Sequence, residues 1–350
     1  MERFAENPLI TPDDVQPTRD DFEVIGTFNP GAFVAGGRIG LLVRVAERPI
    51  ADDEAVVRVP VAADGEGERR IELLAFERSD PAWDFSDARA IVPREDGPGA
   101  CRYLTGLSHL RLAWSDDGRR FEWTDTAIWP TGDLERFGIE DARVTQINGR
   151  YRITYSAISD RGICVGLIST VDFLRFARHG CILPHENKDV CLFPERVGGD
   201  YVALHRPSSD FCRPGMWIAR SPDLEHWGGH RFLAAPRPGE WDSERIGAGP
   251  APVRTPDGWL VVYHGAGDGG YGLGLMLLDS DDPAAVLARS DRPIMTPEAD
   301  YEQSGFFANV VFCNGMVARP DGELWLYYGG ADRCTAGCRC SLDELLGELG

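Results

Sequence analysis

Five copies of one short pattern constrain the fold of this chain more than any other feature. In each copy, a tight turn that contains glycine precedes an apolar, aromatic-rich run that ends in polar residues. The copies are GGRIGLLVRV from Gly36, NGRYRITYSA from Asn148, GGDYVALHRP from Gly198, DGWLVVYHGA from Asp257 and DGELWLYYGGAD from Asp321. Such turns and runs predict β-hairpins, and strand repeats about 50 residues long are typical of propeller blades. The pattern therefore predicts an all-β protein with the fold of a five-bladed β-propeller.

The spacing of the copies indicates one domain with an insertion. Successive copies begin 112, 50, 59 and 64 residues apart, so the long first interval holds extra chain. We expect residues 1–350 to form a single propeller domain, with an insertion around residues 51–100 in or after the first blade. A short C-terminal helix is expected in SLDELLGELG, where Ser341 suits the N-cap position. A two-sheet sandwich with unrelated strand ends is the alternative that remains open.

Charge and cysteine content limit the partners and the compartment of the protein. The formal net charge of −20 argues against nucleic acid and against an anionic membrane, because both attract positive surfaces. No apolar run is long enough for a transmembrane helix, and the N-terminal segment lacks the pattern of a signal peptide. Nine scattered cysteines are typical of a reduced, cytoplasmic protein with buried thiols. The spacing of Cys334, Cys338 and Cys340 lacks the paired CxxC form of a zinc site, so no metal is expected.

The segment Glu140-Asp141-Ala142-Arg143 places three charges in four residues just before a strand that should enter the core. Taken alone, such a segment is most often a solvated surface turn. Here apolar residues lie on both sides of it, and a carboxyl group held against apolar walls has a raised pKa and can act as a general acid. Asp141 is therefore the candidate acid. Arg143 is expected to orient Glu140 or Asp141 through a bidentate pair.

The polar ends of the repeated strands should converge on the central depression of a propeller. The residues expected there are Arg44, Tyr155, His205, Arg206, His264 and Asp332. With Lys188, the cations among them would form a cluster suited to phosphate, although such residues taken singly are usually salt-bridged or snorkelling. Asp332 is a candidate for hydrogen bonds to sugar hydroxyls, with a simple turn residue as the alternative. Aromatic residues that could stack on sugar rings are Tyr103, Trp129, Trp241 and Tyr271.

Eight motifs run in order along the chain from about Phe22 to Asp332. They are FNPGA, LLVRVAERP, SHLRLAWSDDGRRFE, GIEDARVT, KDVCLFPERVGGDYVALHRP, ERIGAGPAPVRTPDGWLVVYHGA, LLDSDDP and YYGGAD. This ordered set resembles glycoside hydrolase family 130, which contains β-mannoside phosphorylases and some β-mannosidases. The resemblance implies a five-bladed β-propeller, in agreement with the number of repeats.

The resemblance also implies roles for individual residues. Asp141 matches the proton donor of the family motif Gly-x-Glu-Asp-Pro-Arg, supported by Glu140 and Arg143. Ala142 replaces the proline of that motif, so the loop is expected to be less rigid. The family's phosphate ligands match Arg44, Lys188, Arg206 and His264, and its sugar-site positions match Asn29 and Asp332. His109 and Arg111 are further substrate-binding candidates, because their segment looks more like members acting on β-1,2-mannosides than on β-1,4-linked ones.

The implied reaction is inverting phosphorolysis of β-mannosides, in which phosphate attacks the anomeric carbon and α-mannose 1-phosphate forms. Inorganic phosphate would be the co-substrate, and no other cofactor is expected. An inverting β-mannosidase is the alternative. Such a hydrolase needs a second carboxylate to activate water. Glu195, Asp242 or Glu244 could supply it. A carbohydrate-binding propeller without turnover is a third alternative. The sequence does not determine the oligomeric state, and a homo-oligomer is possible.

Overall fold

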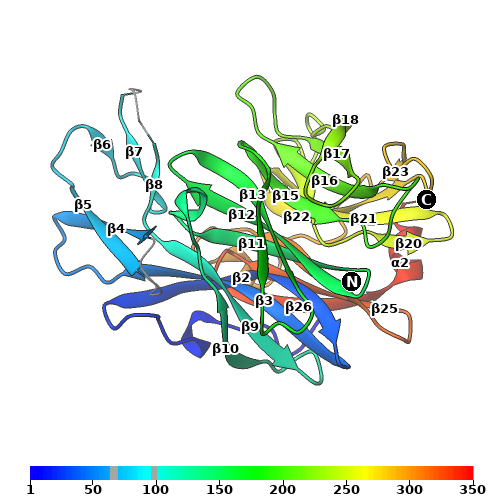
Figure 1. Cartoon of the computed structure of the whole chain (residues 1–350), viewed down its shortest axis with the longest axis horizontal. Helices are drawn as coiled ribbons and strands as arrows, with labels where there is room; N and C mark the ends of the chain where they lie inside the picture. Colours follow the sequence, from blue (N-terminus) through cyan, green and yellow to red (C-terminus); the bar gives the residue numbers. More distant parts are fainter. Residues whose placement is uncertain (64–69, 96–100, 350) are drawn as a thin grey trace.

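The computed structural model of the protein describes residues 1–63, 70–95 and 101–349. Nearly all regular structure in these residues is β-strand, which confirms the prediction of an all-β protein. No helix in the described ranges is long and apolar enough to cross a membrane. Five antiparallel sheets make up most of the molecule (Figure 1).

We number these sheets in chain order and give their strands from one edge to the other. Sheet 1 contains β2 (Phe22–Ala35), β3 (Arg38–Pro49), β9 (Leu107–Ser115) and β10 (Glu122–Ile128). Sheet 2 contains β11 (Ile139–Ile147), β12 (Arg150–Ser159), β13 (Gly162–Thr170) and β14 (Ala177–Leu183). Sheet 3 contains β15 (Asn187–Leu192), β16 (Tyr201–Pro207), β17 (Met216–Ser221) and β18 (Gly228–Ala234).

The last two sheets depart slightly from this regular order. Sheet 4 contains β19 (Arg245–Ala248), β21 (Gly258–Gly267), β22 (Gly270–Leu278) and β23 (Val286–Arg289), and β20 (Val253–Thr255) pairs with β21. Sheet 5 contains β24 (Val311–Ala318), β25 (Glu323–Gly330), β26 (Cys334–Ser341) and β1 (Glu2–Arg3). The N-terminal strand thus completes the sheet that the C-terminal part of the chain builds.

The five repeated patterns of the sequence form β3, β12, β16, β21 and β25. Each is the second strand of its sheet, one position away from the edge strand that comes before it in the chain. Glycine turns and apolar alternation are local signals, which explains why the sequence alone locates these strands.

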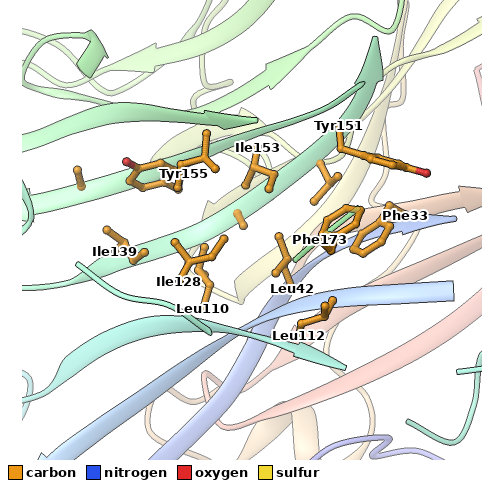
Figure 2. Packing of buried hydrophobic residues seen from close by; sticks show 14 of the residues in the cluster. Phe33, Leu42, Leu110, Leu112, Ile128, Ile139, Tyr151, Ile153, Tyr155 and Phe173 are labelled. Atoms are coloured by element: carbon orange, nitrogen blue, oxygen red, sulfur yellow. The ribbon is translucent and has the colours of Figure 1, made fainter. Parts of the chain in front are cut away.

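Apolar clusters join the sheets in a cycle. One cluster contains Phe33 and Leu42 of sheet 1 and Ile139 and Ile153 of sheet 2, with the side chains of the two sheets pointing toward one another (Figure 2). Further clusters join sheet 2 to sheet 3, sheet 3 to sheet 4, and sheet 4 to sheet 5. A fifth cluster packs side chains of sheet 5 against those of sheet 1. The inner strands of every sheet are therefore buried on both faces, as their largely apolar residues require, whereas outer strands such as β14 and β18 are largely exposed.

The insertion lies between β3 and β9, inside sheet 1. Its described parts form a hairpin of β4 (Val56–Ala63) and β5 (Arg70–Glu77) and a small sheet of β6 (Trp83–Asp84), β7 (Ala90–Pro93) and β8 (Tyr103–Leu104). These strands form a lobe at one end of the molecule (Figure 1, left). Val59, Val61 and Ile91 of the lobe pack on Phe137 and Ile158 of the main body. Residues 64–69 and 96–100 of the predicted insertion lie outside the described residues.

Helices are short and peripheral. The predicted C-terminal helix is α2 (Leu342–Gly347), and the Ser341 hydroxyl accepts a hydrogen bond from the Glu344 amide, as expected of an N-cap. The helix α1 (Asp300–Gln303) and the 3-10 turns Pro12–Asp14 and Asp133–Glu135 were not predicted from the sequence.

A β-bulge recurs in the edge strands that begin sheets 1, 2 and 3. The strand pairing skips two residues after Phe28 in β2, after Glu140 in β11 and after Lys188 in β15. The first skipped residues are Asn29, Asp141 and Asp189, whose φ angles are +49°, +54° and +54°. Asparagine and aspartate tolerate this left-handed conformation better than most residues do. The second skipped residues are Pro30, Ala142 and Val190.

We expect the Ala142→Pro variant to fold and to be as stable as the wild type or more stable. Pro30 occupies the equivalent bulge position of β2, after a residue with nearly the same φ angle, so the bulge accommodates a proline ring. A proline in a compatible position stabilises by about 0.4–1 kcal/mol, since it restricts the unfolded chain. Urea-induced unfolding measures the change.

Ala203→Pro is the matched control, because Ala203 lies in the middle of β16 and is paired on both sides. Proline there removes a ladder hydrogen bond from a strand that is paired on both sides, so this control should be strongly destabilised. A destabilisation of Ala142→Pro as large as that of the control would contradict the equivalence of the two bulges.

Candidate active site

The bulges of β2 and β11 bring a group of polar residues together, which we call the acid cluster: Asn29, Arg44, Glu140, Asp141 and Asp332. The Arg44 guanidinium donates to Glu140 Oε1 at 2.6 Å and to Asp141 Oδ1 at 3.2 Å. The Asn29 amide donates to the same Asp141 oxygen at 3.0 Å. The side chains of Arg44, Glu140 and Asp141 keep 13–17% of their surface exposed, so a solute can reach them.

Three carboxyl groups in this cluster share one guanidinium. Burial raises the pKa of Glu140, against the opposing charge of Arg44. Burial also raises the pKa of Asp332 to about 6, and the nearby charges of Asp141 and Glu140 add to the rise, while Arg44 opposes it. The cluster therefore keeps a proton on Asp332 below about pH 6, which is well above the usual range of an aspartate. Such a group of carboxyls is suited to proton transfer near neutral pH.

Beside the acid cluster lies a second group, the cation cluster: Lys188, Asp189, Arg206 and His264, with Arg143 behind them. Its centre is the carboxylate of Asp189, which is 2% exposed. Asp189 Oδ2 lies 3.1 Å from Arg206 Nη1 and 3.1 Å from His264 Nε2. Arg143 Nη2 donates to Asp189 Oδ1 at 3.2 Å. Burial opposes ionisation of Asp189, but its partners outweigh burial and hold its pKa well below the usual value.

Lys188 and Arg206 lie directly opposite one another on the paired strands β15 and β16. Like charges in this position repel each other. Burial and the charge of Arg206 lower the pKa of Lys188. Among the described residues, no hydrogen bond of the Lys188 amine is found, whereas Arg206 shares Asp189 with two other partners. The pair therefore has the features of an anion site. Lys188 is also the single lysine in the chain.

Two expectations about these residues were wrong. His264 is not a fourth cation at neutral pH, because burial lowers its pKa to about 4 despite the neighbouring Asp189. Arg143 does not form a bidentate pair with Glu140 or Asp141: it donates to the Asp141 main-chain carbonyl, to Asp189 and to the Ala248 carbonyl. Arg44 holds the two carboxyl groups instead, so it belongs to the acid cluster. Lys188 interacts electrostatically with the same Glu140 and Asp141, and the role of Arg44 as a phosphate ligand stays a prediction.

Several other candidates lie elsewhere. His109 is opposite Val45 in the strand pairing, so it occupies the face of sheet 1 that Arg44 does not, as does Arg111. His109 stacks on Trp129 with ring centroids 4.1 Å apart. Tyr155 donates to Glu135 at 2.6 Å, and His205 contacts Asn187 and His230. Neither the Tyr155 hydroxyl nor the His205 imidazole therefore belongs to either cluster.

One of the four aromatic candidates lies at the clusters. Tyr271 interacts electrostatically with Arg206 and Asp332, and it packs near the ring of His264. Phe312, which the sequence did not single out, packs against His264 with the ring centroids 4.1 Å apart and the ring planes tilted by 35°. The remaining aromatic candidates pack within the fold: Tyr103 in the insertion lobe, Trp129 on His109 and Trp241 on Tyr263.

The carboxylates proposed as a base for hydrolysis are not at the site. Asp242 is completely buried and bound by Arg237, Arg289 and Tyr263, so it has a structural role. Glu195 and Glu244 are exposed and have no side-chain contact with either cluster in the described residues. Cys334, Cys338 and Cys340 lie buried along β26 as free thiols, and no metal-binding group of His, Cys, Asp or Glu is found in the described parts of the chain.

Asp189 is the central residue that sequence reasoning missed. Its signal was present: it follows Lys188 directly, and it stands in the third strand of the series that begins with Asn29 and Asp141. The equivalence of Asn29, Asp141 and Asp189 becomes visible only in the strand pairing of three sheets, because the three residues share no sequence motif. The arrangement as a whole places a protonatable carboxyl group beside a site for an anion, which suits acid-assisted attack by an anionic nucleophile.

Comparisons with known proteins agree with this chemistry. A family model described as β-1,4-mannooligosaccharide phosphorylase matches residues 104–349. A β-1,2-mannobiose phosphorylase from Listeria innocua serovar 6a is 45% identical over 350 residues, covering 99% of this chain and 98% of that protein. A 1,2-β-oligomannan phosphorylase from a Thermoanaerobacter species is 40% identical over 243 residues, covering 67% of this chain and 79% of that protein.

A solved structure is similar along the same length. The β-1,2-mannobiose phosphorylase from Listeria innocua in complex with β-1,2-mannobiose has a TM-score of 0.94 at 44% identity, covering 99% of this chain and 98% of that one. The family model covers most of the chain, and the Listeria relative matches it almost from end to end. The chain therefore belongs to glycoside hydrolase family 130.

Proposed function

We propose that this protein is an inverting phosphorylase that converts β-1,2-mannosides and phosphate into α-mannose 1-phosphate and a shortened sugar. The single observation that carries phosphorolysis is the pair of Lys188 and Arg206, two like charges held opposite one another beside Asp141. Binding of phosphate would remove their repulsion. The names of the Listeria and Thermoanaerobacter relatives support β-1,2-linked mannosides as the substrate class.

The residues divide the reaction between them. Asp141, fixed by Asn29 and Arg44, supplies the proton that reaches the glycosidic oxygen through a sugar hydroxyl as the bond to the anomeric carbon breaks. An oxygen of phosphate, bound by Lys188 and Arg206, forms the new bond to that carbon from the opposite face. Cations aimed at the nucleophile replace the carboxylate base that an inverting hydrolase needs. Asp332 is placed to accept hydrogen bonds from sugar hydroxyls beside the acid.

Hydrolysis of the same linkage is the weaker candidate. A solved structure described as a family 130 glycoside hydrolase that targets β-1,2-mannosidic linkages is 22% identical to this chain, which supports a shared fold alone. In the described residues, the one carboxylate inside the cation cluster is Asp189, and three partners already occupy it. It is therefore poorly placed to activate water.

Further proposals concern the whole molecule. The closed cycle of packing between the five sheets supports a five-bladed β-propeller that comprises residues 1–350. The nine free cysteines support a reducing, cytoplasmic location. We propose inorganic phosphate as co-substrate without a further cofactor. His109 and Arg111 lie on the other face of sheet 1 from Arg44, so this proposal gives them no part in the two clusters. Self-association stays a prediction.

The Asp141→Asn variant should lose nearly all turnover, because the amide cannot donate the proton in the same way. We expect formation of mannose 1-phosphate from β-1,2-mannobiose and phosphate to fall by roughly 100- to 10,000-fold, the usual contribution of a general acid. Asp116→Asn is the control, since Asp116 is exposed and pairs with Arg38 far from the site. Equal activity of the two variants would remove Asp141 from the mechanism.

The Lys188→Met variant should bind phosphate poorly, because the site loses one of its two cations. We expect the KM for phosphate to rise about 10- to 100-fold, the usual effect of losing one charge-assisted hydrogen bond. The KM for the mannoside should change far less. Arg196→Met, on the exposed turn before β16, is the matched control. An unchanged KM for phosphate in Lys188→Met would refute the assignment.

The single lysine allows a direct measurement of anion binding without enzymatic turnover. Protein made with ¹³C,¹⁵N-lysine should show one set of lysine side-chain NMR signals, those of Lys188. The pKa of Lys188 is lowered by burial and by Arg206, so added phosphate should raise it and keep the amine charged at higher pH. A titration curve that does not move with phosphate would count against an anion site at this pair.

A further inference from the structure

The insertion lobe contacts the segment before β24 through one arginine. Arg89 lies just before β7 of the lobe, and its guanidinium carbon is 4.9 Å from the ring centroid of Phe307. Phe307 lies in the segment before β24, and its amide donates to the Ala331 carbonyl at 3.1 Å. Ala331 immediately precedes Asp332 of the acid cluster. The lobe therefore contacts the segment that carries one of the candidate substrate residues.

Arg89 is held in this position from two sides. Asp87 accepts hydrogen bonds from the Arg89 side chain at 2.8 Å and 3.0 Å, and also from its amide at 2.9 Å. The Arg89 carbonyl accepts from the Thr105 amide, and the Thr105 hydroxyl donates to the Ala88 carbonyl at 2.7 Å. Thr105 stands just before β9, so the main body of sheet 1 fixes the arginine.

The charge of Arg89 acts on the site. It opposes the rise in the pKa of Asp332 that burial causes. The hydrogen bonds to Asp87 raise the pKa of Arg89 most, and the charges of Asp332 and Tyr271 add to that rise. The Arg89 side chain is nevertheless 47% exposed. Nε and Nη2 bind Asp87, whereas for Nη1 no hydrogen bond is found within the described residues. Nη1 of this fixed guanidinium can therefore donate to a ligand.

Exposure increases from the floor of the site to this arginine. Arg143, Asp189 and His264 are 0–2% exposed, the acid cluster side chains of Arg44, Glu140 and Asp141 are 13–17% exposed, and Arg89 is 47% exposed. The sugar that is attacked must lie between Asp141 and the Lys188–Arg206 pair. The floor behind it is filled with buried ion pairs, so the leaving sugar must extend outward, toward Arg89 and Phe307.

We propose that Arg89 positions the leaving-group sugar by donating from Nη1 to its hydroxyls, with Phe307 as the apolar support of the guanidinium. This inference rests on the proposed function of the site. It assigns the insertion a part in substrate recognition: Arg89 and Phe307, which come from chain segments about 200 residues apart, form the outer wall of the leaving-sugar subsite.

The test uses the synthetic direction, in which α-mannose 1-phosphate and mannose combine and mannose occupies the leaving-sugar subsite. Arg89→Ala should raise the KM for acceptor mannose about 10- to 100-fold, as expected for a lost charge-assisted hydrogen bond. The KM values for α-mannose 1-phosphate and, in phosphorolysis, for phosphate should stay within about twofold of the wild type. A variant that had only lost stability would not raise the KM for acceptor mannose while leaving the other two KM values unchanged.

Arg58→Ala is the matched control. Arg58 belongs to the same lobe and binds Asp52 through Nε and Nη2, as Arg89 binds Asp87, but it has no contact with the acid cluster in the described residues. Its constants should equal those of the wild type. Phe307→Leu should raise the KM for acceptor less than Arg89→Ala, and the double variant should resemble Arg89→Ala alone, because both changes act on one contact.

Two results would overturn the inference and leave the proposed function intact, provided that the wild-type enzyme forms mannose 1-phosphate. In the first, Arg89→Ala has the same KM for acceptor mannose as Arg58→Ala. In the second, Arg89→Ala raises the KM values for acceptor mannose and for α-mannose 1-phosphate equally. Wild-type protein that forms no mannose 1-phosphate from β-1,2-mannobiose and phosphate would overturn the proposed function, and this inference with it.

Discussion

The site depends on one buried carboxylate, that of Asp189. It accepts from Arg143 of sheet 2, lies against Arg206 of its own sheet 3, and contacts His264 of sheet 4. A buried charge without partners would be strongly destabilising. This carboxylate can therefore be buried only if the three sheets that carry its partners are correctly positioned. Arg143 also binds the carbonyl of Asp141, which extends the same network to the candidate acid.

Around this centre, the two clusters keep charges of one sign close together. Three carboxyl groups surround Arg44, and Lys188 faces Arg206 across a strand pair. Neither arrangement is the most stable for an empty protein, because like charges in a poorly hydrated site repel one another. A proton relieves the first cluster and an anion relieves the second. Those are the two species that an inverting phosphorolysis needs next to the anomeric carbon.

The fold places these clusters through repetition. The inner strands of each sheet are buried on both faces because neighbouring sheets pack in a cycle, and the first strands of neighbouring sheets come close together. The bulges of β2, β11 and β15 then turn Asn29, Asp141 and Asp189 away from the regular ladder at equivalent places. The insertion departs from this repetition. It forms a separate lobe of two small sheets between β3 and β9, and it brings Arg89 to the ring of Phe307.

The sequence by itself determined the strands, the family and the identity of most polar residues at the site. Glycine turns and apolar alternation are local, so β3, β12, β16, β21 and β25 could be located without the structure, as could Asp141 and Lys188. Only the tertiary structure decided which charges meet. Arg143 binds Asp189 and not a bidentate neighbour, Arg44 holds the acids, His264 is neutral, and His109 faces away from Arg44. These outcomes depend on burial and on contacts between sheets far apart in the chain, and neither is encoded in the spacing of residues along one strand.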